Sequence, residues 1–131
     1  QTPVKILIVE DDEFLRELYA ETLSGEGFTV ETAADGEEGY GKMKQGGWSL
    51  VLLDIIMPKM NGLEVIKKVK AESPTPVSKS LVFLTNLDKD AEIKEALQYG
   101  DGYLIKSQIT PGDMIREVKM YLSKPQVPPT V

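Results

Sequence analysis

The chain contains neither cysteine nor histidine. Without cysteine it has no disulfide framework, no Cys-based zinc site and no thiol chemistry. Without histidine it has no Ser-His-type catalytic triad and lacks the most common ligand of zinc and haem. No run reaches the roughly 18 apolar residues of a membrane span, and no signal peptide is recognisable. A cytoplasmic location is therefore our default expectation.

Positive charge is also in deficit, with 15 Lys and Arg residues against 21 Asp and Glu residues and a net charge of −6. Non-specific binding to nucleic acid depends on Lys and Arg neutralising phosphates, and anionic membranes attract basic segments. We therefore expect no direct binding of nucleic acid and no docking on membranes. A length of 131 residues, of which 41% are hydrophobic, fits one domain with one core.

Short apolar runs alternate with segments of helical periodicity. Four runs have the composition of strands buried on both faces, and a fifth alternates in the manner of a strand nearer a sheet edge. Helical patterns follow each of them; the first ends at Gly25 and the last begins with Thr110 as N-cap and Pro111 in its first turn. Strict alternation of five strands and five helices predicts a parallel sheet with helices on both faces. The expected strands are residues 4–9, 29–33, 50–53, 81–84 and 103–105.

The glycine and proline residues mark weak points in this pattern. Gly36, Gly39 and Gly41 each lower the helix propensity of the second helix by up to about 1 kcal/mol. Residues 124–131 contain three prolines and cannot continue the last helix. We therefore assign residues 1–123 to one domain and residues 124–131 to a Pro-rich tail or the start of a linker.

Polar residues collect where the predicted strands end. In open α/β sheets the ligand site lies outside the carboxyl ends of the strands, so these side chains should converge at one end of the sheet. They are Glu10, Asp11 and Asp12 after the first strand, Asp54 after the third, Thr85 and Asn86 after the fourth, and Lys106 after the fifth.

This set of groups suits phosphoryl transfer. Crowded carboxylates either raise a pKa or bind a cation, and Mg²⁺ prefers carboxylate and phosphate oxygens. Lys106 supplies a positive charge for a phosphoryl oxygen, and Thr85 supplies a hydroxyl donor. Since phosphoryl transfer needs mainly positioning and charge neutralisation, Asp54 would be the nucleophile that forms an aspartyl-phosphate.

Each residue also has an ordinary structural explanation when it is taken alone. An acidic run after a strand is most often a solvated loop or a helix start, and Asp54 would serve equally as a turn or capping residue. Lys106 alone is most often a surface charge, Thr85 a structural hydroxyl and Tyr103 ordinary sheet packing. Only the joint placement of these residues at successive strand ends favours a functional site.

Four motifs in order resemble the receiver domain of two-component response regulators. They cover about residues 4–123 and lie at residues 6–12 (ILIVEDD), 50–62 (LVLLDIIMPKMNG), 83–85 (FLT) and 102–106 (GYLIK). The resemblance implies a flavodoxin-like, doubly wound five-stranded sheet of strand order 2-1-3-4-5. It also implies a signalling switch rather than an enzyme, although such domains catalyse their own phosphorylation and dephosphorylation.

By position, the resemblance assigns a role to each site residue. Asp54 matches the phospho-acceptor, which would take its phosphoryl group from a histidine kinase or a histidine phosphotransfer protein. Mg²⁺ would be held by Asp11 and Asp54, by Glu10 through water, and by the Ile56 backbone carbonyl. Lys106 matches the phosphate-binding lysine, and Thr85 and Tyr103 match the pair that rearranges on phosphorylation. Asp12 lies just beyond the metal pair and is interpreted as a charge at the helix N-terminus.

The same resemblance implies how the signal leaves the domain. The face formed by the fourth helix, the fifth strand and the fifth helix would change on phosphorylation and would contact an output domain or target protein. The same face would serve for a homodimer.

The sequence departs from the family pattern at several positions. Ser107 follows the lysine where a cis proline is usual, and a cis bond before serine would cost about 3–4 kcal/mol, which favours a trans bond. The stretch from Gly100 to Tyr103 is one residue short, and Asn86 is bulkier than the small residue usual after the threonine. Ile56 and Leu87 occupy positions that help to place the hydrolytic water; because both are apolar, we expect slow autodephosphorylation.

Two other functions fit part of the pattern. A Mg-dependent phosphohydrolase would use Asp54 as a covalent nucleophile, but it would usually carry a second catalytic Asp where Ile56 stands. A degenerate receiver would act only as a protein-interaction module, and Ser107, Asn86 and the short loop keep this alternative open.

Overall fold

The computed structural model describes residues 3–73, 76–86 and 90–123. Within them, five strands form one sheet in the order β2-β1-β3-β4-β5, and every neighbouring pair is parallel. The predicted sheet, its strand order and its edge strand are therefore confirmed. The strands are β1 (Lys5–Val9), β2 (Thr29–Ala33), β3 (Leu50–Asp54), β4 (Leu81–Thr85) and β5 (Gly102–Ile105).

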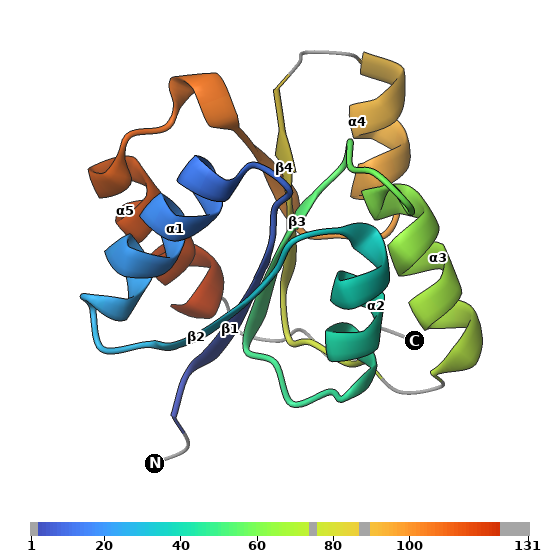
Figure 1. The fold of residues 1–131 in the computed structure, drawn as a ribbon, viewed down its shortest axis with the longest axis horizontal. Helices are drawn as coiled ribbons and strands as arrows, with labels where there is room; N and C mark the ends of the chain where they lie inside the picture. The colour runs from blue at the N-terminus through green and yellow to red at the C-terminus, as the bar shows by residue number, and fades with distance from the viewer. Residues whose placement is uncertain (1–2, 74–75, 87–89, 124–131) are drawn as a thin grey trace.

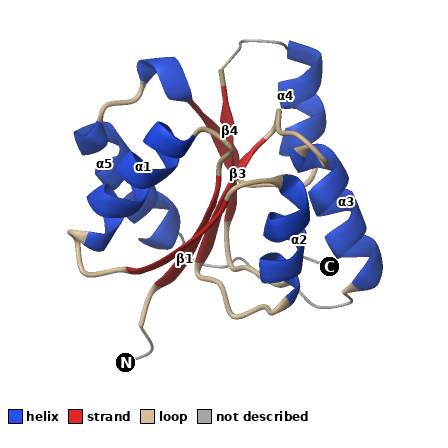
Figure 2. Ribbon diagram, in the orientation of Figure 1, coloured by secondary structure: helices blue, strands red, loops and turns tan. Residues whose placement is uncertain are grey.

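Helices cover both faces of the sheet, as Figures 1 and 2 show. One face carries α1 (Glu13–Ser24) and α5 (Pro111–Ser123), which contact each other. The opposite face carries α2 (Gly36–Lys44), α3 (Gly62–Glu72) and α4 (Asp90–Leu97). A short 3-10 turn, Lys106–Gln108, leads from β5 toward α5. No helix in the described parts of the chain is long and apolar enough to cross a membrane.

The alternation of side chains along each strand divides the core into two clusters. Leu52 of β3 packs with α1 and α5, whereas its neighbours Val51 and Leu53 pack with α2, α3 and α4. Both clusters are buried, which explains why the three central strands read as nearly continuous apolar runs. β2 lies at an edge and has only one fully buried residue, Ala33, which accounts for its alternating sequence.

Side-chain caps fix the helix starts at the carboxyl end of the sheet. Asp12 is the N-cap of α1 and accepts a hydrogen bond from the Leu15 amide at 2.9 Å, which confirms its interpretation as a helix-terminal charge. Asn61 and Glu64 form a reciprocal capping box at α3. The Thr110 hydroxyl accepts a hydrogen bond from the Asp113 amide at 3.1 Å, so the predicted N-cap of α5 is confirmed. These caps stabilise the helices whose first turns surround the polar strand ends.

The glycines of α2 allow close contacts that a larger residue would prevent. A Cβ added to Gly39 would lie 2.6 Å from a methyl carbon of Val9, and one added to Gly36 would lie 1.7 Å from the Met60 carbonyl oxygen. Gly41, in contrast, has open space around it. Two of the three glycines that weaken this helix are therefore required by packing.

We expect opposite effects from the same substitution at two positions of α2. Gly39→Ala should destabilise the domain by about 1–3 kcal/mol because Val9 is fully buried in β1 and has no room to move. Gly41→Ala should stabilise it by about 0.5–1 kcal/mol through helix propensity. Urea denaturation of both variants checks this, and a destabilising Gly41→Ala would contradict it.

The assignment of residues 124–131 to a tail remains a prediction because these residues lie outside those that the structure describes.

Candidate functional site

The strand alternation directs three charged side chains toward the face of the sheet that carries α1 and α5. Asp54 is the last residue of β3, and its side chain lies on the same side of the strand as Leu50 and Leu52. Both leucines belong to the core cluster beneath α1 and α5. Glu10 and Lys106 stand two residues beyond Ile8 and Leu104 of the same cluster. The charged groups thus stand at the ends of three rows of core side chains, those of β1, β3 and β5.

The Lys106 ammonium joins two of the buried carboxylates. Its Nζ donates to Oε1 of Glu10 and to Oδ2 of Asp54, both at 2.9 Å. The other Glu10 oxygen, Oε2, accepts a hydrogen bond from the Asp12 amide at 3.0 Å. Strand ends separated by as many as 96 residues in sequence therefore meet at one ammonium group.

A third carboxylate completes an acidic cluster. One oxygen from each of Glu10, Asp11 and Asp54 lies within 4.8 Å of the others. Glu10 and Asp54 are buried, whereas Asp11 is exposed, so the cluster faces solvent on the side of Asp11. Three carboxylates at this spacing are a donor set that suits a small, hard divalent cation.

The Asp54 side chain is only 2% exposed and the Lys106 side chain only 5% exposed. Both charged groups are thus shielded from solvent in this arrangement. Asp54 lies at the end of β3, as its strand-end position predicts, and its carboxylate is covered by its neighbours.

The surroundings of Asp54 disfavour its charged form. Burial is the main cause, and with the repulsion of Glu10 it raises the pKa of Asp54 to about 7, although the hydrogen bond from Lys106 acts in the opposite direction. For Lys106, burial alone would lower the pKa, but the hydrogen bonds to Asp54 and Glu10 outweigh it and raise the pKa. The ammonium therefore stays charged and neutralises part of the cluster.

Thr85 and Tyr103 lie on the other side of the sheet. Phe83 is paired with Tyr103 in register, and Thr85 follows Phe83 by two residues, so all three share the face that carries α2, α3 and α4. Thr85 is buried, whereas Tyr103 is 38% exposed. The two predicted switch residues are thus diagonal neighbours on adjacent strands, and Tyr103 does not occupy the core.

The loop between β3 and α3 passes close to the acceptor. The Gly62 amide donates to the Ile55 carbonyl at 2.8 Å, and a Cβ on Gly62 would lie 2.3 Å from the Asp54 carbonyl oxygen. The side chain of Ile56 is 60% exposed and points away from the core. Leu87, the second apolar residue expected near the hydrolytic water, lies outside the described residues.

The family departures do not prevent the site from assembling. Among the described residues every peptide bond is trans, including the one between Lys106 and Ser107. The 3-10 turn that starts at Lys106 still presents its ammonium to both carboxylates. The short approach from Gly100 leaves β5 in regular register with β4. Asn86 is exposed beside the site.

Sequence reasoning missed two residues of this region. The Arg16 guanidinium donates to the Glu10 carbonyl at 3.0 Å and to the Asp11 carbonyl at 3.3 Å, so it holds the acidic loop against α1. Tyr19 is buried in the cluster of α1 and α5. Neither is signalled by sequence: Arg16 reads as a solvated helix charge and Tyr19 as a core aromatic.

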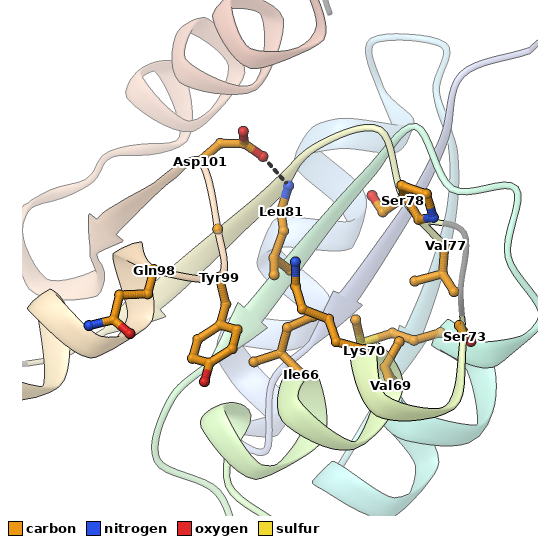
Figure 3. Close-up of a pocket in the computed structure, with 13 residues that line it drawn as sticks. Ile66, Val69, Lys70, Ser73, Val77, Ser78, Leu81, Gln98, Tyr99 and Asp101 are labelled. Atoms are coloured by element: carbon orange, nitrogen blue, oxygen red, sulfur yellow. Dashed lines mark hydrogen bonds between the residues drawn. The ribbon is translucent and has the colours of Figure 1, made fainter. Parts of the chain in front are cut away.

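A hollow lies at the opposite end of the sheet, near the start of β4 (Figure 3). It has a volume of about 510 Å³ and is lined by the end of α3, by the segment that leads into β4 and by the stretch from Gln98 to Asp101. Its one carboxylate, Asp101, already accepts a hydrogen bond from the Leu81 amide at 2.8 Å. This hollow offers no cluster of reactive groups, and none of the acidic residues Glu10, Asp11 and Asp54 lines it.

Comparison with known proteins points to one family. A family model described as the response regulator receiver domain matches residues 6–119. The transcriptional regulatory protein YcbL of Bacillus subtilis is 39% identical over 103 residues, which are 76% of this chain and 43% of the relative. The CpxR homologue of Haemophilus influenzae is 35% identical over 124 residues, which are 95% of this chain and 52% of the relative.

Solved structures agree with this assignment. A CheY-like receiver domain protein from Methanospirillum hungatei JF-1 is 30% identical, with a TM-score of 0.81 over 92% of this chain and 94% of that one. Chemotaxis protein CheY4 of Vibrio cholerae is 27% identical, with a TM-score of 0.80 over 92% of this chain and 99% of that one. The chain belongs to the response regulator receiver domain family, a class of signalling domains, and it spans about half the length of the transcriptional regulators it matches.

The raised pKa of Asp54 predicts how stability depends on pH without divalent metal. The folded protein keeps a proton on Asp54 up to about pH 7, whereas the unfolded chain releases it near the model value of 3.8. Stability should therefore fall as pH rises from 5 to 8. Because the chain has no histidine, few other groups titrate in this range.

Asp54→Asn should remove this loss, so its stability relative to wild type should increase by roughly 2–3 kcal/mol between pH 5 and pH 8. Urea denaturation in EDTA at both pH values measures it. The control is Asp113→Asn, because capping and Arg116 lower the pKa of Asp113 and its effect should be the same at both. A wild type whose stability rises between pH 5 and 8 would contradict the prediction.

Proposed function

We propose that this domain is a phosphorylation-operated signalling switch in which Asp54 accepts a phosphoryl group. The observation that carries the proposal is the meeting of Glu10, Asp11 and Asp54 within 4.8 Å, with the Lys106 ammonium bonded to two of them. An acidic cluster on a loop would serve solubility alone, but a buried cluster that includes an ammonium is expensive to assemble and implies a use.

The donor set fits Mg²⁺. We propose that Asp11, Asp54 and the Ile56 backbone carbonyl are its direct ligands and that Glu10 binds it through a water molecule. When bound, the ion would offset carboxylate repulsion and neutralise charge on the phosphoryl group.

The chain's own residues supply the other parts of the reaction. An Asp54 oxygen forms the new bond to phosphorus while the bond from phosphorus to the donor histidine nitrogen breaks, and the electron pair leaves with that nitrogen. Lys106 moves from the carboxylates to a phosphoryl oxygen and stabilises the charge in the transition state.

We propose that Thr85 and Tyr103 transmit the change. The phosphoryl oxygens attract the Thr85 hydroxyl, and Tyr103 moves from its exposed position toward the space that Thr85 leaves. Their placement on the same face of β4 and β5 supports this coupling. The face formed by α4, β5 and α5 would then change its contacts with an output domain, a target protein or a second copy of the domain.

The donor would be a histidine kinase or a histidine phosphotransfer protein, and the cytoplasmic location stays a prediction. The similar proteins named transcriptional regulators are about twice as long as this chain, which supports an output domain as the recipient of the signal. A phosphohydrolase is less well supported because Ile56 stands where a second catalytic carboxylate would be needed.

Incubation of the chain with acetyl phosphate and Mg²⁺ should add one phosphoryl group, measured as intact mass. Asp54→Asn should abolish the addition because the nucleophile is lost, and Asp12→Asn should keep it because Asp12 only caps α1. Beryllofluoride should likewise bind to the wild type and to Asp12→Asn but not to Asp54→Asn. No gain of mass and no beryllofluoride binding would favour the degenerate receiver that acts only as an interaction module.

Autodephosphorylation should be slow because Ile56 offers no hydrogen bond to an attacking water. The phosphoryl signal should outlast a period of seconds in Mg²⁺ buffer without a phosphatase. Ile56→Gln should shorten its lifetime because an amide can hold the water, whereas Ile56→Leu should not. Loss of the signal within seconds in the wild type would contradict this prediction.

A further inference from the structure

Lys106 is hydrogen-bonded to carboxylate oxygens that, in the proposed function, bind the cation and the phosphoryl group. Its ammonium is hydrogen-bonded to Glu10 and Asp54 at 2.9 Å, the two buried members of the acidic cluster. A divalent cation at this cluster would repel the ammonium and compete for the same oxygens. Cation binding therefore requires that Lys106 move away from at least one carboxylate.

A displaced ammonium at this position needs a new acceptor. The Lys106 side chain is 5% exposed, so water does not take over the lost hydrogen bonds, and a buried ammonium without an acceptor is costly. The acceptor must lie on the side of the sheet that carries α1 and α5, because Lys106 follows Leu104 of that cluster.

Tyr19 has free hydrogen-bonding capacity in this region. Its side chain is 4% exposed, and its hydroxyl is the one buried side-chain polar atom among the described residues with no hydrogen-bond partner. A buried hydroxyl without a partner lowers stability, and phenylalanine would fill the same space without that penalty. Packing alone therefore does not explain a tyrosine here.

The direction of α1 places this hydroxyl near the acidic site. The helix begins at Glu13, directly after the acidic loop, and helical side chains lean toward the N-terminus of their helix. The ring of Tyr19 accordingly extends toward the site. Burial raises the pKa of Tyr19 to about 12, and the charge of Glu10 adds to this effect while the charge of Lys106 opposes it.

We propose that Tyr19 is a positioning residue of the phosphorylation site: its hydroxyl oxygen accepts the hydrogen bond of the Lys106 ammonium when that ammonium leaves the carboxylates. The hydroxyl proton remains available for a Glu10 oxygen. Tyr19 thereby lowers the cost of opening the site to a cation and holds Lys106 within reach of the phosphoryl group. This inference rests on the proposed function.

The experiment measures Mg²⁺ binding to the full chain by calorimetry in a double-mutant cycle. Tyr19→Phe should weaken Mg²⁺ binding by about threefold to tenfold, the contribution of one hydrogen bond. In a Lys106→Ala background the same change should alter the Kd by less than about twofold, because the partner is gone. Tyr121→Phe, the same change elsewhere in this core cluster, should leave the Kd unchanged.

Stability supplies an independent readout. In EDTA the Tm of Tyr19→Phe should equal or exceed that of the wild type, since the hydroxyl has no partner in the resting state. An unchanged Mg²⁺ affinity, an equal loss of affinity in the Lys106→Ala background, or a lower Tm in EDTA would each overturn the inference. Failure of the wild-type chain to bind Mg²⁺ or to be phosphorylated would instead overturn the proposed function.

Discussion

The contact of one ammonium with two buried carboxylates is the constraint on which the rest of the site depends. Lys106 links the ends of β1, β3 and β5 through Glu10 and Asp54. Removing Lys106 would leave two buried carboxylates without their ammonium, whereas removing one carboxylate would leave the ammonium paired with the other. The sheet must therefore hold three strand ends in register, and the caps and close glycine contacts around them serve that requirement.

The two faces of the sheet separate the charged cluster from the predicted switch residues. Asp54 and Lys106 continue the core rows beneath α1 and α5, whereas Thr85 and Tyr103 lie on the face of α2, α3 and α4. The two sets of residues come together at the ends of β3 and β4, where Asp54 is paired with Leu84 next to Thr85. In the proposed switch, a displacement of Thr85 at that edge would couple Asp54 to the opposite face.

Sequence patterns predicted the fold and the meeting of Glu10, Asp11, Asp54 and Lys106, because both depend on strand ends. Apolar runs located the strands to within a residue or so, and the polar residues after them converged as parallel topology requires. The burial of Asp54 beneath Lys106 could not be predicted, since residue order does not reveal which oxygen an ammonium will occupy. Tyr19 and Arg16 were missed for a similar reason: their importance comes from neighbours that only the folded helix brings near.

The contact between Gly36 and the Met60 carbonyl links α2 to the loop that carries Ile56. A side chain at position 36 would push that loop outward, and the displacement would be felt where the loop leaves Asp54. A genetic screen for loss of signalling should consequently recover substitutions in α2, on a helix that contributes no reactive group. The residues whose substitution impairs function therefore extend beyond those that carry reactive groups.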